Sequence, residues 1–413
     1  MSNSPSASSP SGDAAPARHS ELLSQGEPLA VADIRDALVI KEGELFLMTD
    51  PNGNLPSGDD GGYGLYKGDT RYLTVYDLSF DEVRPTVLLS NTELDYSSEH
   101  HLTNPAMVAL DGRSVPKETI EVRRQRVIGT SLLETVQVTN FNIFPVTFGV
   151  CFRFSSDFLD IFEFRGETRE RRGTLATPAV ESDRVVLSYH GLDDIRRKTE
   201  LRFSPTPEEV WETGARFVVS LGHLESLDIS VAVVLDDADG ATKYSTEFER
   251  VSASYTSSLA ANTQVFTSNE FFNAMVERSL RDMRMLTVEG AEGNFIAAGT
   301  PWFSSLFGRD SLITAFQMLA FNPGVARDTL RVLARLQGKK SDDWRDEEPG
   351  KILHELRTGE MATLDEIPMT PYYGSIDSTP LFIMLAAQYV AWTDDRDLIR
   401  DILPNIETAL LWL

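Results

Sequence analysis

The spacing of the apolar residues changes once along this chain, near position 240. From about Ile34 to Asp236 apolar and polar residues alternate, which is typical of β-strands with one face turned inward. After Thr267 the apolar residues recur at intervals of three and four, as in helices that bury one stripe. A single change of this kind favours a sheet domain followed by a helical domain over an interleaved α/β fold.

The alternating half reads as an antiparallel β-sandwich. In "VTFGVCFRF" (146–154) and "LDISVAVVL" (227–235) every second residue is apolar, so each run presents one apolar face. Turn-like stretches such as "DPNGN" and "SGDDGG" separate the runs. We predict the sandwich over residues 29–240. The preceding Ser-, Pro- and Ala-rich residues 1–28 lack the apolar core of a signal peptide and are predicted to be a disordered tail.

A polar, small-residue stretch over 241–266 is predicted to be a linker that carries at most one short helix. Residues 267–413 hold successive helical runs and no strand pattern, so we predict an all-α domain made of helix pairs. The last run, "ETALLWL", ends on an apolar face without a capping residue. We therefore expect the helical domain to be incomplete, and to be completed by a longer product, a second chain or self-association.

Composition narrows the classes of partner. A net charge of -25 over 413 residues repels phosphate backbones and anionic lipids, so nucleic acid and membrane surfaces are excluded as expected partners. The most apolar late run, "STPLFIMLAAQYVAW", is shorter than the roughly 18–20 residues that cross a bilayer. The single cysteine, Cys151, rules out an internal disulfide and fits a reducing compartment. We expect a cytoplasmic protein that acts on a neutral substrate.

Three familiar motifs fail on inspection. "HELRT" (354–358) has Thr358 where a zinc-protease helix needs its second His. "GYGLYK" (62–67) lacks the third Gly of a dinucleotide loop, and "DPNGNL" (50–55) has Leu55 where a calcium loop turns on Gly. We expect no metal and no cofactor.

Two carboxylates in aromatic surroundings remain as candidates for chemistry. Asp310 follows Trp302, Phe303 and Arg309, and Asp377 follows Tyr372 and Tyr373; each stands at the mouth of an apolar helix.

Asp310 could be a first-turn acid that the helix dipole favours, with Arg309 as its partner. Asp377, followed by Ser, Thr and Pro, could be a plain helix N-cap.

If the two helices are neighbours, the two acids lie on one common rim. Aromatic faces pack on the apolar face of a pyranose, and carboxylates and arginine bond its hydroxyls, so such a rim suits a sugar. Glycoside cleavage needs two carboxyl groups, one of them protonated.

The same segments resemble a known family. "GLYKGDTRYL", "GTPWFSSLFGRDSLITAFQML", "PGKILHELRTGE" and "YYGSIDSTPLF" look like the amylo-α-1,6-glucosidase, or glycogen-debranching-like, glycoside hydrolases. The resemblance covers nearly everything after the tail. It implies a β-sandwich followed by an (α/α)6 barrel, of which this chain holds the first part, and an oligo- or polysaccharide substrate.

Carried over to this chain, the resemblance makes Asp377 the general acid of an inverting α-glucosidase. To be protonated near neutral pH in the completed enzyme, Asp377 needs a raised pKa, which we expect Tyr372 and Tyr373 to support by excluding water and a second nearby carboxylate to reinforce. The resemblance makes the other candidates substrate-binding: Trp302 and Phe303 as the wall, Arg309 and Asp310 on sugar hydroxyls, and His354, Glu355 and Arg357 in a rim loop.

The second carboxylate of such enzymes is expected beyond this chain, so the 413 residues alone should bind weakly and hydrolyse nothing. Two alternatives from other functional classes remain open. A non-catalytic carbohydrate-binding or regulatory protein would retain half of the site. A purely structural β- and helical protein would leave both aromatic and acidic rims unexplained.

Overall fold

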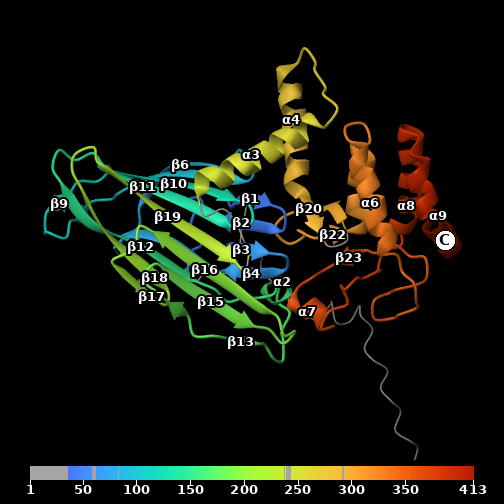
Figure 1. Ribbon diagram of the computed structural model, residues 1–413, viewed down its shortest axis with the longest axis horizontal. Coiled ribbons are helices and arrows are strands. Elements are labelled where there is room, and N and C mark those ends of the chain that lie inside the picture. Colours follow the sequence, from blue (N-terminus) through green and yellow to red (C-terminus); the bar gives the residue numbers. More distant parts are fainter. Residues whose placement is uncertain (1–35, 58–61, 82, 237, 239–242, 291–292) are drawn as a thin grey trace, which may run out of the picture.

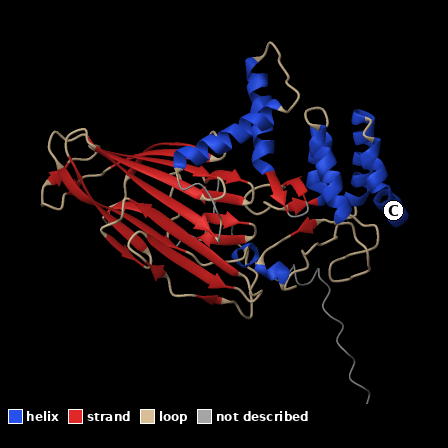
Figure 2. Cartoon of the chain, in the orientation of Figure 1, coloured by secondary structure: helices blue, strands red, loops and turns tan. Residues whose placement is uncertain are grey.

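The computed structural model describes residues 36–57, 62–81, 83–236, 238, 243–290 and 293–413. The predicted tail over residues 1–28 lies outside them. The strands gather in one half of the molecule and most helices in the other (Figures 1 and 2). The predicted order, an antiparallel β-sandwich followed by helices, is confirmed.

A nine-stranded antiparallel sheet forms one layer of the sandwich, in the order β13-β15-β16-β19-β11-β10-β7-β6 with β14 paired to β15. Its strands are β6 (Thr86–Asn91), β7 (Ser97–Thr103), β10 (Ile120–Ile128), β11 (Leu132–Asn140), β13 (Thr174–Leu175), β14 (Ala179–Val180), β15 (Arg184–His190), β16 (Arg196–Ser204) and β19 (Ser226–Leu235).

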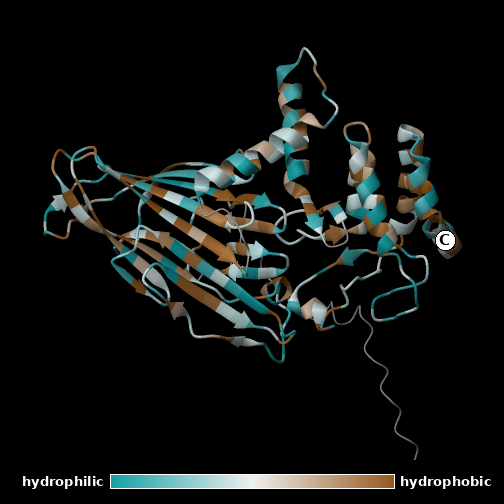
Figure 3. Cartoon of the chain, in the orientation of Figure 1, coloured by the Kyte–Doolittle hydropathy of each residue, from teal (hydrophilic) through white to brown (hydrophobic). Residues whose placement is uncertain are grey.

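The facing layer has four strands in the order β17-β18-β12-β5. They are β5 (Val75–Phe80), β12 (Val146–Ser155), β17 (Glu209–Trp211) and β18 (Gly214–Leu221). The predicted apolar face of β12 is buried from Val146 to Phe154. Phe152 on this strand meets Phe203 of the larger sheet with ring centroids 6.2 Å apart, so the core lies between the two layers. Brown and teal bands alternate along the strands in Figure 3, as this packing requires.

A third sheet of four strands stands at the end of the sandwich that faces the helices. Its strands are β1 (Leu38–Glu42), β2 (Leu45–Thr49), β3 (Gly64–Lys67) and β4 (Thr70–Leu73). β8 (Met107–Val108) and β9 (Ser114–Val115) make a small hairpin, and the four-residue helix α2 (Ile161–Phe164) follows β12. The turn between β3 and β4 and the segment around α2 both reach the helical half.

The interval predicted to be a linker contains α3 (Tyr244–Ala260), a helix of 17 residues. Val251 and Tyr255 on α3 are buried in the sandwich core, and Tyr244 and Phe248 pack against it. These four residues lie at helical spacing on one face of α3. The other residues of the segment are mostly small or polar, so its composition alone suggested a linker. Much of the interval is therefore a helix docked on the sandwich.

The helical half contains α4 (Glu270–Leu286), α5 (Gly308–Met318), α6 (Pro323–Arg335), the short α7 (Glu360–Thr363), α8 (Ser378–Thr393) and α9 (Arg396–Trp412). Helices α5, α6, α8 and α9 enclose a second core that includes Leu312, Leu330 and Phe382. None of the helices in the described part of the chain is both long enough and apolar enough to span a bilayer.

The prediction that this half contains no strands is wrong. It holds two short antiparallel pairs, β20 (Thr287–Gly290) with β21 (Gly293–Ile296), and β22 (Leu306–Phe307) with β23 (Glu355–Leu356). Strands of two to four residues are too short to show a period. The pairing of Leu306 with Leu356 joins segments 50 residues apart, so it depends on the fold and not on local sequence.

Candidate active site

The two helix mouths singled out in the sequence lie together. Helices α5 and α8 pack side by side, and Arg309 Nη1 at the start of α5 donates to Asp377 Oδ2 before α8 over 3.1 Å. The Arg309 and Asp377 side chains are 48% and 41% exposed, so the pair faces solvent. A Cβ on Gly308 would lie 2.0 Å from the Leu353 carbonyl oxygen and 3.0 Å from Ser378 Oγ, so this close approach needs glycine. The fold thus brings the N-termini of α5 and α8, with Arg309 and Asp377, to the same edge of the helical half.

Arg309 pairs with Asp377, and not with its sequence neighbour Asp310 as the sequence suggested. Asp310 lies in the first turn of α5 and is partly exposed. A carboxylate at that place is favoured by the helix dipole. The packing of α5 against α8, rather than adjacency in the chain, decides which acid receives the guanidinium.

Asp377 is not a helix cap in the hydrogen-bonding sense. It occupies the N-cap position of α8, but its side chain makes no capping hydrogen bond. Its Oδ1 instead accepts from Ser375 Oγ over 2.6 Å, and its Oδ2 from Arg309. The carboxylate is therefore held by side chains at the rim and remains available to a ligand.

The pKa of Asp377 is lowered in this chain, and the rise expected for the completed enzyme is not seen here. The hydrogen bond from Ser375 lowers the pKa of Asp377, and Arg309 lowers it further. The two tyrosines do not shield it: Tyr373 is buried and donates to the Leu336 carbonyl, while Tyr372 donates to Asp346 over 2.8 Å. Asp377 is thus an ionised carboxylate in this chain.

A row of rings leads away from this pair. Phe303 meets Phe307 edge to face at 5.7 Å between centroids, Phe307 meets His354 at 5.7 Å, and His354 meets Tyr372 at 6.0 Å. Phe303 is 45% exposed at one end of the row. His354 Nδ1 is buried and has no hydrogen-bond partner among the described residues. The row supplies apolar surface with one polar atom unsatisfied.

Arg357 and Glu355 lie underneath this surface and hold the loop that carries it. Arg357 Nε donates to Glu355 Oε1 over 2.5 Å, Nη1 to Asp69 Oδ1 over 2.8 Å and Nη2 to the Trp302 carbonyl over 2.8 Å. Asp69 Oδ2 also accepts from the Thr358 amide over 2.8 Å. Arg357 and Glu355 are buried, so in this structure they order the rim loop from within.

Asp69 is a residue that sequence reasoning missed. It lies in the turn between β3 and β4 of the sandwich, within "GLYKGDTRYL", a segment with no chemistry of its own to attract notice. Its 288-residue separation from Arg357 leaves no local signal. Trp302, which we predicted as a wall, stacks on Phe164 of α2 at 5.1 Å, so it too joins the two halves.

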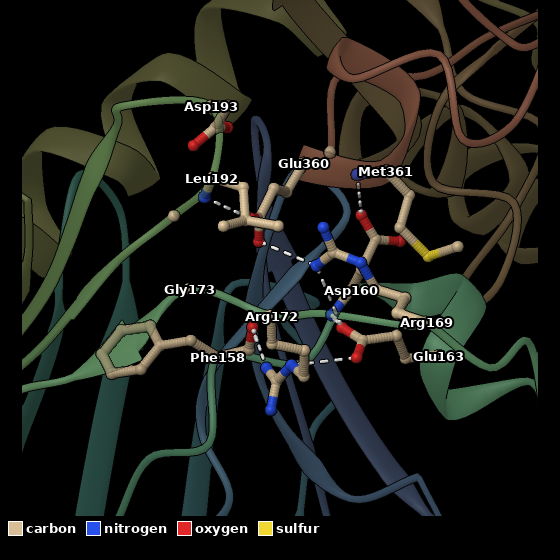
Figure 4. Close-up of polar contacts among 12 residues, drawn as sticks. Phe158, Asp160, Glu163, Arg169, Arg172, Gly173, Leu192, Asp193, Glu360 and Met361 are labelled. Atoms are coloured by element: carbon tan, nitrogen blue, oxygen red, sulfur yellow. Dashed lines mark hydrogen bonds and ion pairs between the residues drawn. The ribbon is translucent and has the colours of Figure 1, made fainter.

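A second set of contacts docks α7 on the sandwich (Figure 4). Glu360 accepts from Arg169 Nη1 over 3.0 Å, from the Tyr189 hydroxyl over 2.9 Å and from the Leu192 amide over 2.6 Å. Asp160 caps α2 through the Phe162 amide and also accepts from the Met361 amide over 3.2 Å. The sandwich thus fixes the position of the rim loop on both sides.

The buried Asp160 predicts a pH-dependent stability. Burial raises the pKa of Asp160 to about 7, and the Asp69 carboxylate adds to this rise. The folded state therefore holds this proton at pH values where the unfolded chain, with a pKa near 3.8, has lost it. The contribution is fully present below the unfolded pKa and is lost as pH rises through about 7.

We expect Asp160→Asn to flatten the fall in Tm between about pH 5 and 8 that the parent shows. Thermal melts at the two pH values measure this slope. Asp183→Asn, on the exposed surface of the sandwich, serves as the control and should keep the parental slope. Equal slopes for Asp160→Asn and the parent would contradict the assignment.

Comparison with known proteins agrees with this architecture. Residues 40–232 match the family model of the N-terminal domain of some glycogen debranching enzymes. The fold defines a two-part protein in which a β-sandwich precedes helices. The match covers the sandwich and confirms, over these residues, the resemblance seen in the sequence. No curated protein matches the sequence.

A solved structure of a larger protein shares the fold at low identity. A protein from the human microbiome, assigned as a kojibiose phosphorylase, superimposes with a TM-score of 0.61 at 8% identity, over 92% of this chain and 57% of its own. The present chain therefore spans little more than half the length of that protein. A protein assigned as an aldose 1-epimerase from Escherichia coli K12 has a TM-score of 0.28 at 8% identity, over 48% of this chain and 98% of its own, which is too low to support an argument.

Proposed function

We propose that this protein is a glycoside-hydrolase-like protein that acts on α-glucans or α-glucosides, of the debranching α-1,6-glucosidase type and inverting at the anomeric carbon. The observation that carries the proposal is the exposed Arg309–Asp377 pair at two adjacent helix mouths, beside the row of rings from Phe303 to Tyr372. The match of the sandwich to a glycogen-debranching domain supports the choice of glycan.

The parts of this rim suit a sugar ring. Rings such as Phe303 offer an apolar face to a pyranose, and a guanidinium beside a carboxylate can bond vicinal hydroxyls in pairs. Arg309 and Asp377 then orient the glycan, and Asp310 adds a carboxylate on the same helix mouth. The neutral substrate fits a chain with a net charge of -25.

Asp377 is our candidate for the proton donor, under one condition. Ser375 and Arg309 keep it ionised in this structure, and an acid must be protonated to assist the leaving oxygen. A second carboxylate brought close to Asp377 would raise its pKa by repulsion between like charges. We propose that this carboxylate, which activates water, is supplied from outside these 413 residues, by a further segment or a second chain.

A non-catalytic carbohydrate-binding protein is the second candidate. The lowered pKa of Asp377 favours it, because an ionised carboxylate paired with arginine binds hydroxyls without donating a proton. The two candidates share the glycan and differ only in turnover. Both predict binding by the 413-residue chain.

We expect the chain to bind the trisaccharide panose, which contains α-1,4 and α-1,6 bonds, and not to hydrolyse it. Arg309→Met should weaken binding about tenfold or more, because it removes charge-assisted hydrogen bonds to hydroxyls. Isothermal titration measures the affinity, and chromatography of the sugar measures hydrolysis. Arg400→Met, on the exposed surface of α9, is the matched control and should bind as the parent does.

Absence of binding to panose and to maltotriose by the parent would overturn the proposed function. Hydrolysis by the chain alone would show that the second carboxylate lies within these residues. In an enzyme that turns over, Asp377→Asn should abolish hydrolysis and largely preserve binding, and unchanged hydrolysis would overturn the role of Asp377.

A further inference from the structure

The sandwich places one arginine beside the row of rings. Arg165 ends the short helix α2, and its Cζ lies 5.6 Å from the ring centroid of Phe162 and 5.9 Å from that of Phe303. Phe303 is the exposed end of the row that leads to His354 and Tyr372. Arg165 therefore stands at the candidate sugar-binding surface, although it belongs to the other half of the chain.

The guanidinium of Arg165 contacts aromatic rings, and its hydrogen-bond donors are not used by the described residues. Within the described residues it makes no hydrogen bond and no ion pair, and its side chain is exposed. Neighbouring arginines are committed: Arg71 to Asp157, Arg169 to Glu360 and Arg357 to Asp69. Partial burial and the positive charge of Arg357 lower the pKa of Arg165. Because these donors face solvent beside the rings, they are available to a ligand that covers Phe303.

The segment that carries Arg165 is rigidly held. Asp160 and Glu163 form a capping box at the start of α2, and the Arg165 amide donates to the Ile161 and Glu163 carbonyls at its end. Phe164 lies between Trp302, stacked at 5.1 Å, and the guanidinium of Arg71, whose Cζ is 5.0 Å from the ring centroid. The backbone that carries Arg165 is thus fixed, so binding a ligand need order only the side chain.

The surroundings favour a neutral, hydroxyl-bearing ligand over an anion. The carboxylates of Glu355 and Glu167 act on Arg165 and oppose the charge of Arg357, and carboxylates this near would repel an anionic ligand. A planar guanidinium fork can bond two vicinal hydroxyls while a sugar ring covers the neighbouring phenyl face. Phe303 is 45% exposed, so part of its ring stays open to a pyranose beside the guanidinium.

We propose that Arg165 is a glycan-binding residue contributed by the sandwich, donating paired hydrogen bonds to hydroxyls of a sugar ring that packs on Phe303. The proposal rests on the proposed function and extends the binding surface across both halves of the protein. It gives the sandwich a direct part in recognition in addition to holding the rim loop.

The test compares affinities for panose by isothermal titration in the 413-residue chain. Arg165→Met keeps the apolar stem over Phe162 and removes the donors, and we expect it to weaken binding about tenfold or more. Arg165→Lys, which keeps the charge without the fork, should recover part of the loss. Arg113→Met is the control, because Arg113 lies 5.1 Å over the Phe144 ring, on the sandwich and outside the candidate site.

The outcomes separate the two proposals. Arg165→Met with parental Tm and weakened binding supports a binding role, and parental affinity in Arg165→Met would overturn it. If Arg165→Met lowers Tm, the decision rests on Arg165→Lys at parental Tm: affinity below that of the parent supports the role and equal affinity overturns it. A parent that binds no glycan contradicts the proposed function itself.

Discussion

Replacing Arg357 by methionine is expected to lower the free energy of unfolding by about 3–5 kcal/mol, the usual cost of leaving buried charges unpaired. Arg357 neutralises two buried carboxylates, Asp69 of the sandwich and Glu355 of the rim loop, and also bonds the Trp302 carbonyl. Methionine fills much of the volume but leaves both carboxylates without their cation. Urea unfolding followed by circular dichroism measures the loss.

The same variant should lose glycan binding, since the rim loop and Trp302 lose their common anchor. Two comparisons isolate the cause. Arg400→Met removes an exposed ion pair with Asp397 and should cost less than about 0.5 kcal/mol. Adding Asp69→Asn and Glu355→Gln to Arg357→Met should recover part of the stability, because no charge is then buried alone. A loss below about 1 kcal/mol in Arg357→Met would contradict the reading of this network.

The second large effect is expected in the sandwich core, where Glu134→Gln should destabilise the fold by about 3–5 kcal/mol. Glu134 Oε1 lies 2.6 Å from Arg124 Nε and 3.1 Å from Arg126 Nε, and Oε2 accepts from the Tyr76 hydroxyl over 2.5 Å. All three charged side chains are fully buried. Burial alone would raise the pKa of Glu134, but the two arginines outweigh it and lower the pKa to about 2.

Glutamine keeps the shape and the bond to Tyr76, yet it leaves two guanidinium cations in the core. Replacing all three charged residues together, as Arg124→Met, Arg126→Met and Glu134→Leu, should be much closer to neutral, because no charge is then desolvated. Denaturant midpoints with matched slopes measure both variants. Equal destabilisation by the single and triple replacements would show that packing, and not the lone charges, sets the cost.

Much of the architecture could be predicted from the sequence, because the signals are local and periodic. Alternation in "VTFGVCFRF" requires one face inward, and the face from Val146 to Phe154 is buried as expected. The change to helical spacing after Thr267 separates the two halves. The resemblance of the first half to glycogen-debranching proteins was also visible in the segment "GLYKGDTRYL", and the family match over residues 40–232 confirms it.

The sequence alone also marked the candidate site, because aromatic residues and acids before apolar helices form an unusual local pattern. It named Arg309, Asp310 and Asp377, and it inferred that their helices would share one rim if they were neighbours. Tertiary structure decided the pairing. Arg309 bonds the acid across the helix interface, and that contact together with Ser375 reverses the expected direction of the Asp377 pKa.

Tertiary structure also decided which residues far apart in the sequence come into contact. The sequence suggested that Arg357 binds substrate in the rim loop. In the structure Arg357 is buried and bonds Asp69, 288 positions away, so the pair joins the two halves of the protein. Arg165 had no motif at all, and only packing brings it over Phe303. Periodicity and capping depend on neighbours within a few residues, so a sequence determines elements and their buried faces. Charge partners and pKa values depend on groups brought together by folding, so the three-dimensional structure alone determined them here.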